Sequence, residues 1–185
     1  SVSFALERLG IDFTITDDNE TIRAADKVIF PGVGEASTTM KYLKDKQLDS
    51  LIRDLKQPVL GICLGMQLMC KHSEENDTQC LGIFDEEVKR FIPAGDMKVP
   101  HMGWNQLTLS NGWLDPKVDN KSVYFVHSYY VPVNPNTSAI TEYTVPFSAA
   151  LQKNNFYAVQ FHPEKSGESG VRMLKNFVSL CSPND

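Results

Sequence analysis

The first half of the chain alternates between short apolar runs and segments with helical periodicity. Residues 1–9 are helical in pattern, with Phe4, Leu6 and Leu9 apolar, and Gly10 follows as a stop signal, so this segment predicts a helix. Period-two alternation and compact apolar runs predict strands where they occur. The predicted elements are a helix over residues 1–9, strands over 12–16 and 27–30, and a mostly helical stretch over 35–56 with a break near Lys46.

An apolar run over residues 58–62 predicts a buried strand, and this strand stops at Cys63. A helix-compatible run follows at once and extends to about His72. Strands and helices that alternate in this way form a parallel sheet with right-handed crossovers and helices on both faces. The first half of the chain therefore predicts an α/β fold.

The second half carries stronger β signals and ends in one amphipathic helix. Val171, Leu174 and Phe177 recur at helical spacing and predict that helix over residues 167–180. Because no linker or internal repeat interrupts the pattern, we expect a single domain over residues 1–185. The predicted strands or hairpin arms cover residues 86–92, 106–110, 122–133, 139–145, 147–152 and 156–161.

Composition excludes several classes of function. The chain has 185 residues, of which 42% are hydrophobic and 22% charged, as is typical of a globular domain with a sizeable core. Its net charge of −5 argues against nucleic acid or an anionic membrane as the main partner. No apolar run approaches the roughly 20 residues that span a bilayer, and no secretory signal opens the sequence, so we expect a cytoplasmic protein.

The cysteines and histidines do not predict a metal or disulfide framework. The histidines are dispersed, and the cysteines lack CxxC spacing, so we expect reduced thiols and no metal site. Only Cys63 has neighbours that predict chemistry. The others, which read as small hydrophobic residues, are Cys70, Cys80 and Cys181.

Cys63 lies in the pattern Gly-x-Cys-x-Gly, between Gly61 and Gly65. This pattern is the cysteine counterpart of the nucleophile elbow, a strained turn between strand and helix that lifts the nucleophile out of the sheet. The glycines leave room for the turn and for a substrate, and the helix that follows favours the thiolate form. Cys63 is therefore the predicted nucleophile.

A cysteine nucleophile needs a base and a group that orients the base. His162 and Glu164 flank Pro163, and residues two apart on an extended segment project to the same face. Like Cys63, His162 follows the carboxyl end of a predicted strand, the edge where sites form in open parallel sheets. A surface His-Pro turn is the plainer interpretation of this segment alone, but together with Cys63 it predicts a Cys-His-Glu triad.

The segment Pro-Gly-Val-Gly at residues 31–34 ends another predicted strand. Its glycines allow backbone N–H groups to face a substrate oxygen and form half of an oxyanion hole, with the N–H of Leu64 as the other half. Alone, this segment is equally compatible with an ordinary Pro-Gly turn.

Together these segments resemble the class I, or triad-type, glutamine amidotransferases. The resemblance rests on Gly-Ile-Cys-Leu-Gly-Met-Gln at 61–67, Phe-His-Pro-Glu at 161–164 and the 31–34 segment. Within that family the chain is most similar to the glutaminase subunits of imidazole glycerol phosphate synthases, and the likeness covers nearly the whole chain in order. The narrower motifs are Pro-His-Met-Gly-Trp-Asn at 100–105, Tyr-Phe-Val-His-Ser-Tyr at 124–129 and Gln-Phe-His-Pro-Glu-Lys-Ser at 160–166.

The resemblance implies a flavodoxin-like, mixed but mostly parallel sheet flanked by helices, with an added antiparallel β portion. Members of the family begin with a strand and a Tyr-Gly-x-Gly-Asn loop before the helix that starts here at Ser1 and Val2. We therefore expect such a strand to precede residue 1 in the natural protein.

The resemblance further implies that glutamine is the nitrogen donor and that no cofactor takes part. In this mechanism Cys63 attacks the carboxamide carbon, His162 protonates the departing ammonia and Glu164 orients the imidazole. Backbone N–H groups of Val33 and Leu64 hold the oxyanion. The implied substrate contacts are Gly32, Gly34, Gln67, Glu75, Ser128 and Tyr129. On the residues alone, Gln67 also fits an ordinary helix position and Glu75 a solvated run of charges.

The resemblance also implies a partner, a (β/α)8-barrel synthase subunit that receives the ammonia in a heterodimer. The implied interface positions are His101, Trp104, Tyr124 and Lys165. Packing of aromatic side chains in the core explains Trp104 and Tyr124 equally well on sequence alone. Two other functions remain open at this point: the glutaminase of a different amidotransferase, and a catalytically inert binding domain on the same fold. A cysteine hydrolase or chaperone of the wider flavodoxin-like group fits less well, because it lacks the His-Pro-Glu segment.

Overall fold

The computed structural model describes residues 1–110 and 112–181, and a six-stranded mixed sheet lies at its centre in the order β1-β2-β12-β11-β10-β7. One half of this sheet is parallel: β1 (Val28–Pro31) pairs with β2 (Val59–Ile62), which pairs with β12 (Phe156–Val159). Because Ile62 lies opposite Val159, the two strands end at the same edge. The residues that follow them, Cys63 and His162, therefore leave the sheet at one place.

The other half of the central sheet is antiparallel. It consists of β11 (Val145–Lys153), β10 (Thr137–Tyr143) and β7 (Thr108–Leu109). Beside it, β6 (His101–Gln106) and β8 (Ser122–His127) form a two-stranded ribbon. The predicted α/β fold, with a parallel portion and an added antiparallel portion, is confirmed.

A smaller sheet has the strand order β4-β3-β5-β9. Its strands are β3 (Cys70–Ser73), β4 (Thr78–Gln79), β5 (Phe84–Arg90) and β9 (Tyr129–Tyr130). This sheet continues from the short helix after Cys63 and brings Tyr129 back toward that helix.

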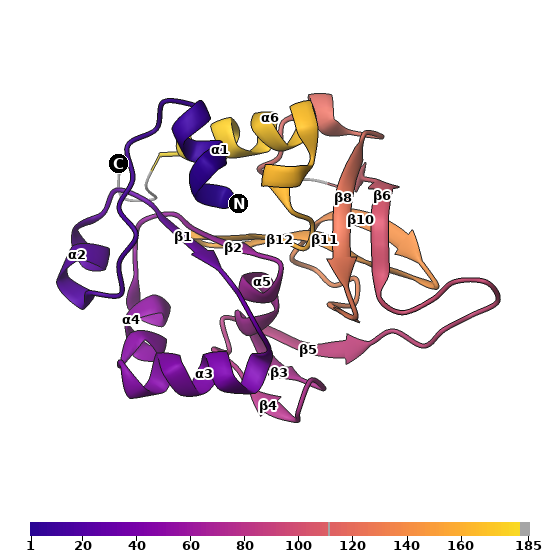
Figure 1. The fold of residues 1–185 in the computed structure, drawn as a ribbon, viewed down its shortest axis with the longest axis horizontal. Helices are drawn as coiled ribbons and strands as arrows, with labels where there is room; N and C mark the ends of the chain where they lie inside the picture. Colours follow the sequence, from indigo (N-terminus) through magenta and orange to yellow (C-terminus); the bar gives the residue numbers. More distant parts are fainter. Residues whose placement is uncertain (111, 182–185) are drawn as a thin grey trace.

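Helices cover both faces of the central sheet (Figure 1). On one face lie α1 (Val2–Arg8) and α6 (Gly167–Val178), and on the other lie α3 (Ala36–Asp45), α4 (Leu48–Asp54) and α5 (Leu64–Leu68). The remaining helices are α2 (Asn19–Ala24) and the 3₁₀ turns η1 (Pro116–Val118) and η2 (Pro163–Lys165). None of the helices among the described residues has the length and apolar character that crossing a membrane requires.

The strands divide their side chains between two hydrophobic clusters, as the period of two requires. Leu60 and Val159 belong to the cluster under α1 and α6, whereas Val59 and Ala158 belong to the cluster over α3, α4 and α5. All four are completely buried. A sheet buried on both faces fixes its register firmly, so the ends of β2 and β12 are held rigidly at the same level.

Some predicted elements differ from the structure. The strand predicted over residues 122–133 divides into β8 and β9, which belong to different sheets. Residues 12–16 form no strand, and Ile15 in that segment is 82% exposed, because no strand among the described residues pairs with it. The helix predicted to reach His72 ends at Leu68, and the chain then enters β3. Pairing of Cys70 with Phe84 in β5 overrides the local helical pattern at this point.

Candidate active site

Cys63 lies in a strained turn between β2 and α5. Its backbone has φ 54° and ψ −109°, a conformation that costs a non-glycine residue about 1–3 kcal/mol. The surrounding structure maintains this strain, since the Cys63 N–H donates to the Val159 carbonyl at 2.9 Å. A Cβ on Gly65 would lie 1.9 Å from the Phe30 carbonyl oxygen, so only glycine fits there. The predicted nucleophile elbow is therefore present.

The helix that follows Cys63 stabilises a thiolate less than the sequence analysis predicted. α5 has five residues, and a helix this short has only a small macrodipole. The groups beside the sulfur must therefore supply most of the stabilisation of a thiolate.

His162 and Glu164 follow β12 and point toward each other. His162 has an extended backbone with φ −97°, as expected before a proline, and its Nδ1 lies 2.7 Å from Glu164 Oε1. Both side chains are largely shielded, with 19% of His162 and 7% of Glu164 exposed. The carboxylate therefore fixes the orientation of the imidazole ring and leaves Nε2 as the nitrogen available for proton transfer.

The backbone of His162 is bonded to strand β8 through a closed set of three contacts. The His162 N–H donates to the Tyr124 carbonyl at 2.9 Å, and the Tyr124 N–H donates to Ser166 Oγ at 2.9 Å. The Ser166 hydroxyl in turn donates to the His162 carbonyl at 2.6 Å. The base is thus held by the ribbon β6–β8 as well as by its own strand.

The protonation of His162 depends on both of its neighbours. Hydrogen bonding to the Cys63 side chain, followed by hydrogen bonding to Glu164, raises the pKa of His162 to about 9. Burial acts to raise the pKa of Glu164, but hydrogen bonds from His162 and the backbone outweigh it and leave this pKa lowered. At neutral pH the pair is therefore imidazolium and carboxylate, and the imidazolium proton lies beside the Cys63 sulfur. The fold thus brings together side chains from segments that lie far apart in the sequence.

The Pro-Gly-Val-Gly loop packs directly against the elbow. A Cβ on Gly32 would lie 2.4 Å from Leu64 Cβ and 2.7 Å from the Gly65 nitrogen, which shows how closely the two backbones approach. Gly34 has φ 86°, and the Val33 side chain is 84% exposed. The predicted oxyanion residues Val33 and Leu64 are therefore on neighbouring segments at the same sheet edge.

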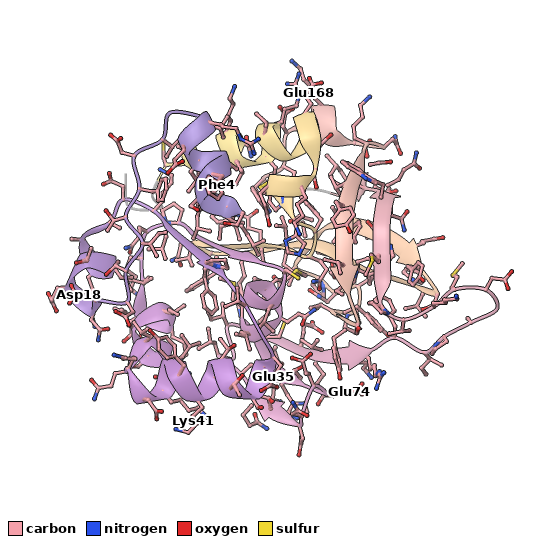
Figure 2. The ribbon with its side chains drawn as sticks, in the orientation of Figure 1. Phe4, Asp18, Glu35, Lys41, Glu74 and Glu168 are labelled. Atoms are coloured by element: carbon pink, nitrogen blue, oxygen red, sulfur yellow. The ribbon has the colours of Figure 1, made fainter. Side chains whose placement is uncertain are left out.

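The far end of this loop is anchored by a residue that the sequence analysis missed. Glu35 lies at the start of α3 (Figure 2). It caps this helix by accepting hydrogen bonds from the N–H groups of Ser37 and Thr38, and it also accepts one from Asn76. Hydrogen bonds from the Ser37 side chain and backbone, then from Thr38 and Asn76, lower the pKa of Glu35 to about 2. An acidic residue just before a helical run is a recognisable N-cap, so this role could have been found.

Glu75, a predicted substrate contact, is hydrogen-bonded to the start of the same helix. Its Oε1 accepts a hydrogen bond from the Ala36 N–H at 2.6 Å. In this structure its carboxylate thus stabilises the start of α3 and, through it, the loop that carries Val33. No local pattern in the sequence indicates this contact, because the two residues are 39 positions apart.

Gln67 and Tyr129, both predicted substrate contacts, are bonded to each other. Gln67 is buried, and its Nε2 donates to the Tyr129 carbonyl at 2.9 Å and to Gln160 Oε1 at 3.0 Å. The neighbouring Ser128 carbonyl accepts the Phe91 N–H at 3.0 Å. The groups of these residues named here are therefore already engaged in hydrogen bonds within the protein.

Gln160 is the first residue of the Gln-Phe-His-Pro-Glu-Lys-Ser motif, but the sequence analysis assigned it no role. It is fully buried on the segment that leads to His162, and its Nε2 lies 3.7 Å from Cys63 Sγ. The period of two along β12 and its extension places Gln160 on the same face as His162, so the sequence did contain an indication of this position.

The four predicted interface residues separate into one buried residue and three at the surface. Trp104 is 58% exposed and packs edge-on against Tyr124, with 6.1 Å between ring centroids. Lys165 Nζ lies 5.9 Å from the Tyr124 ring. His101, by contrast, is 3% exposed and stacks on Tyr143, so it does not reach the surface. The alternation of β6 turns His101 inward and Met102, at 63% exposure, outward.

This arrangement has the parts that acyl transfer from an amide requires. A sulfur nucleophile, a base held in a fixed orientation and two backbone segments beside the nucleophile converge at one sheet edge. The protonated imidazole is suited to donate its proton to a departing amine, and the buried carboxylate stabilises the charge of the ring.

Comparisons with known proteins identify a family and several proteins that are similar to this chain. The family described as glutamine amidotransferase class-I matches residues 2–181. A protein of Bacteroides fragilis (strain YCH46), named imidazole glycerol phosphate synthase subunit HisH, is 60% identical over 182 residues, which cover 97% of this chain and 93% of that protein. A protein of the same name from Idiomarina loihiensis is 50% identical and covers 97% of this chain and 91% of its own length.

A solved structure shows a similar fold. It is that of a glutamine amidotransferase from Thermotoga maritima, with a TM-score of 0.63 and 18% sequence identity. The match covers 96% of this chain and 74% of the other. At this level of identity, the similarity concerns the arrangement of helices and strands.

Proposed function

This chain belongs to the class I glutamine amidotransferase family, and from that membership and its site geometry we propose that it hydrolyses glutamine through Cys63, His162 and Glu164. The chain is the glutaminase subunit of an imidazole glycerol phosphate synthase and takes part in histidine biosynthesis. The single observation that carries the mechanism is the coupling of the Cys63 side chain to His162, whose other nitrogen is bonded to Glu164.

The first half-reaction forms a thioester and releases ammonia. The Cys63 thiolate attacks the side-chain carboxamide carbon of glutamine, and the carbonyl oxygen becomes an oxyanion held by backbone N–H groups of Val33 and Leu64. As the tetrahedral intermediate collapses, the C–N bond breaks and the His162 imidazolium gives its proton to the leaving nitrogen. The products of this step are ammonia, a glutamyl thioester on Cys63 and a neutral His162.

The second half-reaction restores the enzyme. Neutral His162 takes a proton from water, and the resulting hydroxide attacks the thioester carbon. Collapse of this intermediate breaks the C–S bond and releases glutamate, leaving the Cys63 thiolate beside a protonated His162. Glu164 stabilises the imidazolium whenever it is present, because its carboxylate lies 2.7 Å from Nδ1.

We place the ammonia-accepting partner, a (β/α)8-barrel synthase subunit in a heterodimer, on the outer face of the ribbon β6–β8. Met102 and Trp104 are exposed there, and such apolar side chains are typical of a protein interface. The ribbon also contacts the base, since the Tyr124 carbonyl accepts the His162 N–H. Ammonia formed at His162 therefore leaves close to this face.

Two further features complete the proposal. Residues 1–185 act as one amidotransferase domain, because strands from both halves of the chain build the same central sheet. The four free cysteines suit the reducing conditions of the cytoplasm.

The proposed function is tested by comparing glutamine-dependent and ammonia-dependent synthesis. In the complex with the copurified synthase subunit, Cys63→Ala should abolish imidazole glycerol phosphate formation from glutamine but leave formation from ammonium salts unchanged. Cys181→Ala is the matched control, because this cysteine is free and exposed. Glutamine-dependent turnover by Cys63→Ala, or equal loss of both activities, would contradict the mechanism.

A further inference from the structure

The Cys63 sulfur has two polar neighbours besides His162. The Val126 carbonyl oxygen lies 3.9 Å from Sγ, and Gln160 Nε2 lies 3.7 Å from it. A neutral thiol can donate to the carbonyl, but a thiolate can only accept hydrogen bonds. The carbonyl therefore favours the thiol, and the amide N–H of Gln160 favours the thiolate.

The direction of the Gln160 amide is fixed by a carbonyl that can only accept. The Tyr129 carbonyl accepts one N–H of Gln67, and the same Gln67 nitrogen donates to Gln160 Oε1. Gln160 must therefore turn its oxygen toward Gln67 and its NH₂ group toward Cys63. Because Gln160 is completely buried, water does not compete for this orientation.

The Tyr129 carbonyl is itself held from its other side. His127 Nδ1 donates to it at 2.7 Å, and His127 Nε2 accepts from His101 Nδ1 at 3.0 Å. Burial lowers the pKa of His127 to about 3 and that of His101 to about 4, so both rings are neutral at physiological pH. The two histidines in this chain of contacts therefore carry no charge. Gln67 donates to both the Tyr129 carbonyl and Gln160, and Gln160 donates to the sulfur.

We propose that Gln160 is a further catalytic residue, whose side-chain N–H stabilises the Cys63 thiolate and is aimed by Gln67 and the Tyr129 carbonyl. This inference rests on the proposed function, in which Cys63 is the nucleophile. The Val126 carbonyl lies beside the sulfur, and helix α5, which follows Cys63, is too short to stabilise a thiolate by itself. The N–H of Gln160 explains how the thiolate is stabilised in these surroundings.

The test is the pH dependence of alkylation of Cys63 by iodoacetamide in the full chain, followed by peptide mass spectrometry. Gln160→Met removes the donor without adding charge, and Gln160→Glu keeps an acceptor for Gln67 but places a carboxyl oxygen at the sulfur. The exposed Cys181 serves as an internal reference in every sample. The other ionisable groups near the sulfur, which no variant changes, are His162, Glu164 and His127.

For Gln160→Met we expect the midpoint of Cys63 alkylation to lie about one pH unit higher than in the wild type, so that alkylation at any pH well below the midpoint becomes about tenfold slower. Gln160→Glu should shift the midpoint further, and the Cys181 profile should not move. Ser148→Ala is the matched control: it also loses buried hydrogen bonds in the same sheet, but it has no contact with Cys63. Its Cys63 profile should equal that of the wild type.

Two results would overturn the inference. One is superimposable Cys63 profiles for wild type and both Gln160 variants, and the other is an equal shift in Ser148→Ala. If Gln160→Met does not fold, Gln160→Glu decides the question, because it retains the contact with Gln67. Failure of the proposed function is seen separately, as glutamine-dependent turnover that survives Cys63→Ala.

Discussion

Gly170 in α6 offers a way to displace the base without altering any catalytic side chain. A Cβ at this position would lie 1.8 Å from the Pro163 carbonyl oxygen and 2.7 Å from the Pro163 carbonyl carbon. Pro163 lies between His162 and Glu164, so a shift of its backbone also shifts both of these residues. Because the obstacle is backbone rather than a flexible side chain, Gly170→Ala requires α6 and η2 to separate.

The size of the effect follows from this distance. Carbon and oxygen approach no closer than about 3.3 Å in ordinary C–H···O contacts, so the two segments must separate by about 1.5 Å. A misplacement of about 1 Å in a catalytic group costs about 100-fold in rate. Overpacking of this kind also lowers the free energy of unfolding by about 1–3 kcal/mol. We therefore expect a folded protein whose kcat for glutamine hydrolysis falls about 100-fold.

The assay measures glutamate release by the complex together with urea unfolding of the amidotransferase chain. Gly10→Ala is the control, since Gly10 has φ +69° and open space around it, so alanine there adds backbone strain of about 1–2 kcal/mol without a clash near the site. It should lose stability but keep its kcat. Wild-type kcat in Gly170→Ala, or an equal loss of kcat in both variants, would refute the reasoning.

Three other predictions follow from the charges and the surface. NMR titration should give His162 an apparent pKa near 9, and Glu164→Gln should lower it, because the carboxylate stabilises the imidazolium. Since the pKa of His162 is raised on folding, the stability that this residue contributes is complete below about pH 6.5 and is lost as pH rises through 9. The free energies of unfolding of wild type and Glu164→Gln should therefore converge at alkaline pH. Glu35 has a lowered pKa, so the stability that it contributes is present above about pH 4.5 and lost as pH falls through 2, and Glu35→Gln should remove this acid dependence. Trp104→Ala should weaken copurification of the synthase subunit, whereas Ile15→Ala, which removes an even more exposed apolar side chain elsewhere, should not.

The parts of the site that could be predicted from sequence depend on local geometry. Gly61 and Gly65 predict the turn at Cys63 because only glycine tolerates the close backbone contacts there. His162 and Glu164 are two positions apart around a proline, and that spacing alone places them on one face. The α/β alternation then brings the carboxyl ends of the strands to one edge.

The parts that could not be predicted depend on contacts between distant segments. The strand after Leu68 forms because Cys70 pairs with Phe84, which a local helical pattern does not reveal. Glu75 is engaged by the start of α3 through a contact that spans 39 positions. His101 is buried because β6 turns that face toward Phe125 and Tyr143, and the sequence does not determine which face of a ribbon is covered.

The three contacts among Tyr124, Ser166 and His162 join the backbone of the base to the ribbon. The backbone of His162 cannot move relative to β8 unless these hydrogen bonds break. A displacement of β8 would therefore also displace the backbone of His162. In the complex proposed above, the docked surface is therefore connected to the base through a single strand, β8.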